Sequence, residues 1–302
     1  MPRYHFLQLD VFTRRPFGGN QLAVFTDARG LTTEQMQSLA REMNFSETTF
    51  VLPPTLPEAV KKVRIFTPAM EMPMAGHPTV GTTAALVQYG MAQPANGSLV
   101  LELGIGAVQV DIDNRASGLP FVWMNHRMPQ FSPVFASRSA VAEALGIEPD
   151  EVRADLPLEV VSTGVPFLFV PLASLEAIGR ACSEAGALAR LFEGGELANV
   201  ALFTTQVVDP AARFHARMYA PHLAGIVEDP ATGSMAAPFG AYAAKHGLIP
   251  AGPLVTFLIE QGLEMRRPSQ IHVEVGRQDE SFTSLRIGGD SVIVGEGDIF
   301  WE

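Results

Sequence analysis

The sequence predicts an α+β protein built from two similar halves, and three observations support this fold class. Its 302 residues correspond to about two domains of average size. Hydrophobic residues make up 47% and charged residues 18%, which supplies a sizeable core and argues against disorder. A series of strand, loop, helix and closing glycine also occurs twice along the chain. Two equivalent halves facing each other would form a cleft, a common place for a small-molecule site.

The first half is predicted to contain mostly strands, with two helices among them. Residues 4–12 and 21–25 are strand-like and flank a turn-forming segment at 16–20. Thr32 or Thr33 can cap a helix that should end near Asn44. The other expected elements are strands at 48–52, 63–66, 99–103, 107–112 and 120–124, and a helix at 77–89 that is ended by Gly90.

A second series of elements begins after a proline-rich segment. Pro129 and Pro133 predict a linker, so we assign residues 1–128 to a first lobe and 129–302 to a second, with the last strand able to return to the first. Cys182 is expected to be an inert, buried or half-buried thiol inside a helix. The predicted elements after the linker are a helix capped by Ser137 and stopped by Gly146, strands at 159–161 and 167–170, and a helix at 175–191.

The repeat has an offset of 153 residues in its strand and 157 residues in its helix. The four-residue difference is an insertion in the second loop, which contains Glu228 and Asp229. The two predicted helices, 77–89 and 234–246, have the same length and the same glycine stop. The matched segments are RIFTP (64–68) with RMYAP (217–221), Gly76-His77 with Gly233-Ser234, and Gly90 with Gly247.

Composition excludes several classes of protein. The net charge is −11 and no run of Lys or Arg is longer than two residues, so the chain lacks the cationic surface of a nucleic-acid binder. Cys182 is the only cysteine, which excludes an intrachain disulfide and Cys-rich zinc sites. The N-terminus has no signal-peptide pattern, and the uncharged segment 72–101 is interrupted by prolines. We therefore expect a cytoplasmic protein with no membrane partner.

A glycine immediately precedes each of the two equivalent helices. Gly76 and Gly233 would let an anionic ligand approach the free N–H groups and partial positive charge of a helix N-terminus. Two such ends in one cleft would bind a carboxylate well. The alternative is ordinary helix capping, by Ser234 and with Pro78 in a first-turn position.

Four polar residues near these helix ends could carry out proton transfer. Glu47, His77, Asp229 and Ser234 would place titratable groups beside anion-binding amides, which is suited to moving a proton on a carbon acid without a cofactor. The alternatives are a water-facing glutamate, a structural histidine and an Asp-Pro turn without a chemical role.

Other catalytic motifs are absent from the sequence. It contains no HExxH, no GxSxG around Ser234, no GxxxxGK[ST] and no GxGxxG that opens a helix. We therefore expect no metal and no cofactor. The competing hypotheses are a non-catalytic small-molecule-binding protein and a serine hydrolase that uses Ser234.

Five motifs are spread along the chain: GGNQLAVF (18–25), FSETTF (45–50), RIFTP (64–68), AGHP (75–78) and EDPATGS (228–234). Together they resemble the phenazine biosynthesis PhzF-like family, in the family's order and over nearly the whole chain. The resemblance implies the diaminopimelate epimerase-like fold, with two similar lobes that each wrap a mixed sheet or barrel round a central helix, and an active site in the cleft. It also implies a homodimer and an isomerase of the trans-2,3-dihydro-3-hydroxyanthranilate type that shifts a proton, and with it a double bond, on a small carboxylate-bearing substrate.

The resemblance also implies roles for individual residues. Glu47 matches the glutamate that takes and returns the proton, and we expect His77 and Asp229 to act with it. Amino-acid epimerases of this fold use two cysteines at the helix N-termini, where this chain has His77 and Ser234. Pro230 and Met235 depart from the motif of the phenazine enzymes, so the substrate can differ from theirs. The residues expected to bind substrate are Ser46, Gly76, Gly233 and Ser234.

Overall fold

The computed structural model describes residues 2–114, 118–134, 137–182, 185–192, 198–220 and 227–301. The chain divides into two compact units. Met1–Asn125 and Gly288–Glu302 form the first unit, and His126–Ile287 form the second. No helix in the described part of the chain is long and apolar enough to cross a membrane.

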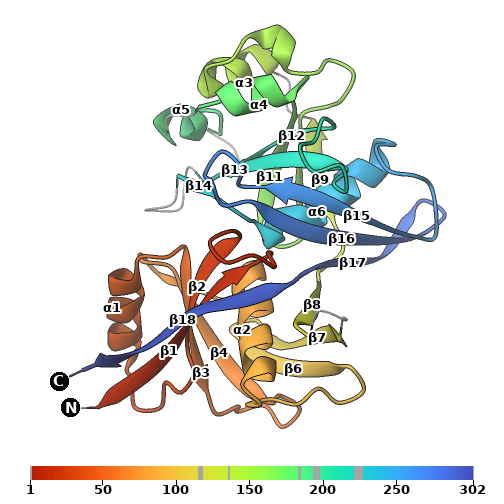
Figure 1. The fold of residues 1–302 in the computed structure, drawn as a ribbon. Coiled ribbons are helices and arrows are strands. Elements are labelled where there is room, and N and C mark those ends of the chain that lie inside the picture. Colours follow the sequence, from red (N-terminus) through yellow and green to blue (C-terminus); the bar gives the residue numbers. More distant parts are fainter. Residues whose placement is uncertain are drawn as a thin grey trace. The chain divides into compact units, whose positions relative to one another are not determined.

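The first unit wraps a curved mixed sheet around one helix, α2 (Gly76–Gln88) (Figure 1). The neighbouring strands β2 and β3 are parallel, as are β4 and β6, whereas β1 pairs antiparallel with β2 and β18, β4 with β3 and β5, and β7 with β6 and β8. Every residue of α2 from Gly76 to Leu86 is buried, because strands β1, β2, β3 and β8 contact it. The strands are β1 (Arg3–Val11), β2 (Asn20–Phe25), β3 (Glu47–Leu52), β4 (Lys61–Phe66), β5 (Glu71–Met72), β6 (Ser98–Leu103), β7 (Gly106–Asn114), β8 (Pro120–Asn125) and β18 (Ser291–Phe300).

The strand β3 presents opposite faces to two helices, since side chains alternate along a strand. Phe50 packs on one face with Met36 and Leu39 of α1 (Thr33–Met43). On the other face, the hydroxyl of Thr49 lies 2.8 Å from that of Thr82 in α2. Glu47 is two residues before Thr49 and therefore lies on the α2 side of the strand.

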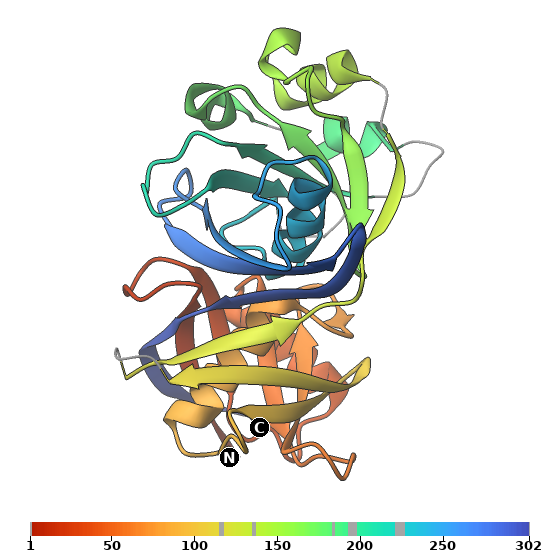
Figure 2. The same cartoon turned by 90° about the vertical axis from the view of Figure 1, so that its right-hand side faces the viewer.

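The second unit encloses the helix α6 (Gly233–Lys245) within curved strands, as Figure 2 shows. A further core lies among α3 (Arg138–Leu145), α4 (Leu175–Arg180), α5 (Ala185–Arg190) and the strands β11 and β12. The remaining elements of this unit are η1 (Pro149–Glu151), β9 (Gln130–Val134), β10 (Glu159–Ser162), β11 (Pro166–Pro171), β12 (Asn199–Thr204), β13 (Phe214–Tyr219), β14 (Glu228–Asp229), β15 (Leu254–Gln261), β16 (Ser269–Gln278) and β17 (Ser281–Gly289).

The predicted repeat is present in the topology of the two units. The strands β1, β2, β3, β4, β6 and β7 follow the same sequence of antiparallel and parallel pairings as β10, β11, β12, β13, β15 and β16. Both central helices have 13 residues. The segment that matches 64–68 extends to Pro221, which lies outside the described residues.

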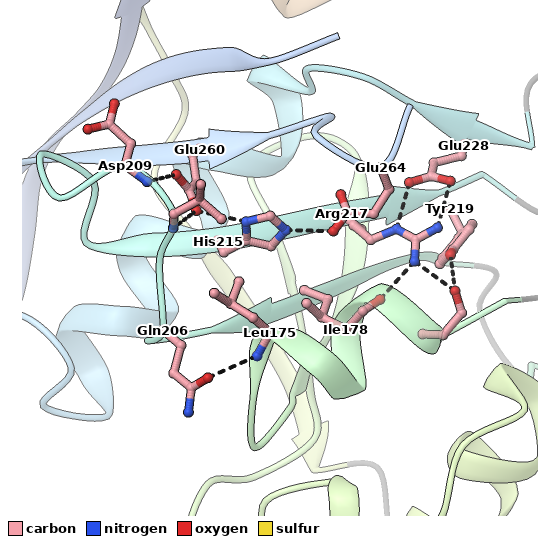
Figure 3. Close-up of polar contacts among 12 residues, drawn as sticks. Leu175, Ile178, Gln206, Asp209, His215, Arg217, Tyr219, Glu228, Glu260 and Glu264 are labelled. Carbon is pink, nitrogen blue, oxygen red and sulfur yellow. Dashed lines mark hydrogen bonds and ion pairs between the residues drawn. The ribbon is translucent and has the colours of Figure 1, made fainter. Parts of the chain in front are cut away.

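Equivalent ion pairs also recur in the two units. Arg64 donates two hydrogen bonds to Glu71, at 2.7 and 2.6 Å, and the equivalent Arg217 donates two to Glu228, at 2.8 and 2.9 Å. Glu102 accepts hydrogen bonds from the N–H groups of two successive loop residues, and its counterpart Glu260 does the same. Figure 3 shows the Arg217 and Glu260 contacts.

Two local predictions for the second half are wrong. The predicted linker at 129–133 is mostly strand β9, which pairs with β10. The helix predicted at 175–191 is two helices, and Cys182 lies between them as an exposed thiol. The chain leaves the helix there because Arg217 and Tyr219 donate hydrogen bonds to the carbonyl of Ala181, and the N–H of Cys182 donates to Leu145. Ser183 and Glu184 lie outside the described residues.

Candidate functional site

Three polar side chains meet near the N-terminus of α2 in the first unit. Because β2 and β3 are parallel and Leu22 pairs with Glu47, both strands begin at the same edge of the sheet. Asn20 lies at the start of β2, and His77 is the second residue of α2. His77 Nε2 is 3.5 Å from Glu47 Oε2, and His77 Nδ1 is 3.2 Å from Asn20 Nδ2. The structure thus brings Glu47 and His77 together, 30 residues apart in sequence.

Burial determines the charge of His77 in this cluster of polar side chains. The His77 side chain is 5% exposed and that of Glu47 is 12% exposed. Burial lowers the pKa of His77 to about 3, although a hydrogen bond to the backbone of Gln21 acts in the opposite direction. His77 is therefore neutral at pH 7, and Glu47 does not have the water-facing environment that was the alternative. A glutamate beside a neutral imidazole in a dry site is suited to general acid/base chemistry.

The other predicted residues of the first unit lie directly beside this pair. Ser46 precedes Glu47 and is partly buried. Gly76 is the buried first residue of α2, and its cap residue Ala75 makes no side-chain capping bond. Alanine has no side-chain acceptor, so the N-cap residue of α2 leaves the N–H groups of the first turn without a side-chain cap. The helix begins one residue earlier than predicted.

In the second unit, Asp229 lies beside the start of α6. It ends β14 and is 7% exposed. The hydroxyl of Thr232 donates a hydrogen bond of 2.6 Å to Asp229 Oδ2, and the side-chain amide of Gln261 donates one of 2.8 Å to the Asp229 carbonyl. This environment differs from that of a simple Asp-Pro turn, because side chains from the helix cap and from β15 hold the aspartate.

The predicted anion-binding residues of this unit occupy the first turn of α6. Gly233 is buried, Ser234 is partly buried, and Met235 is 1% exposed. The cap residue Thr232 makes no side-chain capping bond. Thus neither central helix has its N–H groups capped by its N-cap side chain.

The acid/base residues occur in only one of the two repeats. His77 is equivalent to Ser234 at the offset of 157. Thr48 pairs with Phe66, and Val200 pairs with Tyr219, which is the counterpart of Phe66. The counterpart of Glu47 is therefore Asn199, which cannot exchange a proton at neutral pH. The second unit supplies a different carboxylate, Asp229.

Sequence reasoning did not single out three polar residues of these sites. Asn20 stands in the GGNQLAVF segment, where an asparagine after two glycines is typical of a turn. Thr232 and Gln261 contact Asp229 or its helix cap, and only long-range contacts reveal Gln261. Within the described ranges, no group of three or more His, Cys, Asp or Glu side chains could hold a metal ion.

Comparison with known proteins places the chain in a family. The family model described as "Phenazine biosynthesis-like protein" matches residues 9–297. The chain belongs to this family. An uncharacterized isomerase of Mesorhizobium japonicum is 40% identical over 99% of this chain and 100% of its own. The trans-2,3-dihydro-3-hydroxyanthranilate isomerase of Pseudomonas chlororaphis is 33% identical over 98% and 99% of the two chains. The chain is therefore an isomerase of the PhzF type.

Solved structures confirm the predicted fold class. The Bacillus anthracis phenazine biosynthesis protein of the PhzF family superposes with a TM-score of 0.93 at 30% identity, over 100% of both chains. A hydroxyproline epimerase from Agrobacterium vitis has a TM-score of 0.64 at 15% identity, over 98% of this chain and 92% of its own. The latter shows a shared fold alone. The chain thus has an α+β fold of the epimerase-like class.

Proposed function

We propose that this protein is a cofactor-independent isomerase that moves a proton and a double bond on a small cyclic carboxylate of the trans-2,3-dihydro-3-hydroxyanthranilate type. Glu47 removes a proton from one carbon of the substrate, the double bonds shift, and Glu47 returns a proton to another carbon. The atoms of substrate and product are the same. His77 stays neutral and positions the carboxyl group of Glu47, while Asp229 binds or orients a polar group of the substrate.

The observation that carries this proposal is the pairing of Glu47 with a neutral His77 in a buried site. A site that excludes bulk water limits side reactions at the reacting carbon, and a general base must lie within reach of the proton that it removes. The absence of a second Glu47 in the repeat supports a single acid/base residue over two opposed ones. The named relatives support the substrate class.

The anion-binding role of the two helix ends follows from the same chemistry. Gly76 and Gly233 precede N–H groups that carry partial positive charge, and an anionic substrate would be stabilised by them. We therefore propose Ser46, Gly76, Gly233 and Ser234 as substrate-binding residues. The alternatives of a serine hydrolase and of a non-catalytic binding protein predict different outcomes in the experiment below.

The decisive experiment is the substitution Glu47→Gln, which keeps the size of the side chain and removes its ability to exchange a proton. The kcat for trans-2,3-dihydro-3-hydroxyanthranilate should fall by at least about 10²-fold, the lower end of the usual range for general acid/base catalysis. Binding of the stable aromatic analogue 3-hydroxyanthranilate, measured by calorimetry, should change little. Turnover in D₂O should place deuterium in the product to the extent that Glu47 exchanges its proton with solvent.

The matched control is Glu42→Gln, since Glu42 is an exposed glutamate of α1. It should retain the kcat of the unmodified protein. Full activity in the Glu47→Gln variant would remove Glu47 from the chemistry. Binding of the analogue without any turnover by the unmodified protein would favour the binding-protein alternative, and covalent reaction of Ser234 with a fluorophosphonate would favour the hydrolase.

A further inference from the structure

A buried amide braces the segment that carries Asp229. Gln261, the last residue of β15, is 0% exposed. Its Nε2 donates to the Asp229 carbonyl at 2.8 Å and to Thr232 Oγ1 at 3.0 Å, and its Oε1 accepts from the Thr232 N–H at 3.1 Å. Burying an amide is costly unless it is hydrogen-bonded. These three hydrogen bonds join the Gln261 amide to Asp229 and Thr232, at the two ends of one four-residue segment.

Thr232 uses its hydroxyl in an unusual way for an N-cap residue. An N-cap threonine ordinarily accepts a hydrogen bond from an N–H group in the first turn of its helix. Thr232 makes no such bond and instead donates to Asp229 Oδ2 at 2.6 Å. The Gln261 amide orients this hydroxyl, because its Nε2 donates to the same oxygen. The series of hydrogen bonds that runs from Gln261 through Thr232 therefore ends on a carboxylate oxygen of Asp229.

The first unit shows that the fold does not require these hydrogen bonds between Gln261, Thr232 and Asp229. A Cβ on Gly104 would lie 2.8 Å from the backbone of Pro73, and a Cβ on Gly262 would lie 2.4 Å from the backbone of Pro230. These two close approaches are equivalent, since the residues are related by offsets of 157 and 158. The backbone junction is thus built in the same way in both halves. The residues of the first unit at the positions of Asp229, Thr232 and Gln261 are Met72, Ala75 and Leu103.

We propose that Thr232 and Gln261 are positioning residues that hold the Asp229 carboxylate in the orientation used for the reaction. This inference rests on the proposed function, in which Asp229 contacts the substrate. The hydroxyl of Thr232 occupies one carboxylate oxygen and restricts rotation of the carboxylate about its Cβ–Cγ bond. Gln261 fixes both the backbone at Asp229 and the direction of that hydroxyl. Neither residue needs to touch the substrate.

The first test compares Thr232→Val with Thr232→Ser. Valine has nearly the same shape as threonine and lacks the hydroxyl, whereas serine keeps it. The kcat for trans-2,3-dihydro-3-hydroxyanthranilate should fall by about 10²-fold in Thr232→Val, the size of effect that a small misplacement of a reacting group produces. It should return to within a few-fold of the unmodified protein in Thr232→Ser. A purely structural role would not separate the two variants when both melt at the same temperature.

The second test uses the residue that the first unit has at the equivalent position. Gln261→Leu should fold, because Leu103 occupies that position and is 4% exposed. It should lower kcat in the same way as Thr232→Val. The matched control is Ser269→Ala, since the Ser269 hydroxyl donates to the carbonyl of Pro230 at 3.1 Å in the same turn. Ser269→Ala should leave kcat unchanged.

Crystal structures of the variants separate this inference from the proposed function. In Thr232→Val and Gln261→Leu the Asp229 carboxylate should rotate or shift, and in Thr232→Ser it should stay in place. An unmoved Asp229 in both of the first two structures would overturn the positioning role, whatever the kinetics. A displaced Asp229 with unchanged kcat would overturn its link to catalysis. If the unmodified protein does not turn over the compound, the proposed function fails, and the crystal structures alone decide whether the two residues position Asp229.

Discussion

Three buried histidines show how the surroundings of one residue type determine its charge. Burial lowers the pKa of His77 to about 3 and that of His126 to about 4. Burial also acts to lower the pKa of His215, but hydrogen bonds from its ring to Glu264 and Glu260 raise it overall. These bonds are 2.9 and 2.8 Å long (Figure 3). The catalytic candidate is thus a neutral histidine, whereas His215, whose pKa is raised, belongs to a structural cluster with two glutamates.

The charged His215 should make the stability of the second unit depend on pH. Its folded-state pKa lies above the ordinary value of 6.5, so its contribution is fully present below about pH 6.5 and is lost as the pH rises through the raised value. The pKa of Glu264 is lowered from 4.5, despite burial, by its bond to His215. Its contribution is present above about pH 4.5 and is lost as the pH falls through the lowered value.

We therefore expect His215→Leu to cost roughly 3–5 kcal/mol of unfolding free energy at pH 5.5, as for other broken buried ion pairs, and less at pH 9. Urea unfolding at the two pH values measures the difference. His5→Leu is the control, since His5 also lies near two carboxylates, Asp298 and Glu296, but its side chain is 39% exposed. That change should cost about 1 kcal/mol or less. An equal cost at both pH values for His215→Leu would contradict a stabilising proton on His215 that is lost between pH 5.5 and pH 9.

At the scale of elements, the two central helices end in the same way. The N–H of Met91 donates to the Leu86 carbonyl and that of Gly90 to Val87, and the equivalent bonds join Leu248 to Ala243 and Gly247 to Ala244. This is the Schellman arrangement, which needs a left-handed residue after the helix. Gly90 has φ +65° and Gly247 has φ +69°, so the glycine stops predicted from the repeat are confirmed.

Replacing either glycine should cost nearly the same free energy. A Cβ at Gly90 or Gly247 would meet nothing within 4 Å, so only the backbone penalty of a left-handed alanine remains, about 1 kcal/mol. Gly90→Ala and Gly247→Ala should therefore each lower the unfolding free energy by this amount in denaturant titrations. The asparagine variants should lose less, because asparagine tolerates the left-handed region. A loss of several kcal/mol at one glycine alone would show that the two helix ends are not equivalent.

Local patterns in the sequence were sufficient for elements that depend on local signals. Thr32, one of the two expected cap residues, caps α1, and the helix ends near Asn44 as expected. Asn44 itself adopts a left-handed conformation. The break between α4 and α5 depends on Arg217 and Tyr219, which lie more than 30 residues away and are invisible to helical periodicity. Gln261 ends an apolar strand, where a polar residue usually indicates an exposed strand end. The expected homodimer, cytoplasmic location and lack of a cofactor stay predictions.

At the scale of the whole molecule, the repeat separates what the fold needs from what the reaction needs. Features present in both units include the strand pairings, the glycine stops and the Arg–Glu ion pairs. Even the aromatic neighbour recurs, since Arg64 lies over Phe66 at 5.1 Å and Arg217 over Tyr219 at 5.2 Å. Among the described polar residues at the two helix ends, Glu47 and His77 occur in the first unit and not at the equivalent positions of the second, and Asp229, Thr232 and Gln261 occur in the second and not at the equivalent positions of the first. This difference supports the proposed functional role of these five residues.

The shared Arg–Glu ion pair should nevertheless contribute differently to the unfolding free energy in the two units. The Arg64 and Glu71 side chains are 21% and 40% exposed, whereas those of Arg217 and Glu228 are 8% and 16% exposed. Arg217 also donates to the carbonyls of Ile178 and Ala181, each at 2.7 Å. Removing Arg217 would leave a largely buried carboxylate and two carbonyls without these donors, while Glu71 remains accessible to water.

We therefore expect Arg217→Met to lower the unfolding free energy by roughly 3–5 kcal/mol and Arg64→Met by about 1 kcal/mol or less. Methionine keeps much of the aliphatic stem, so the difference reports on the guanidinium group. Arg217→Lys should recover little of the loss, because an ammonium cannot reproduce the two parallel bonds to Glu228 together with the carbonyl contacts. Denaturant titrations of the three variants provide the measurement. Equal losses for Arg64→Met and Arg217→Met would mean that burial of the pair does not determine its contribution, and that the repeat is energetically as well as geometrically symmetric.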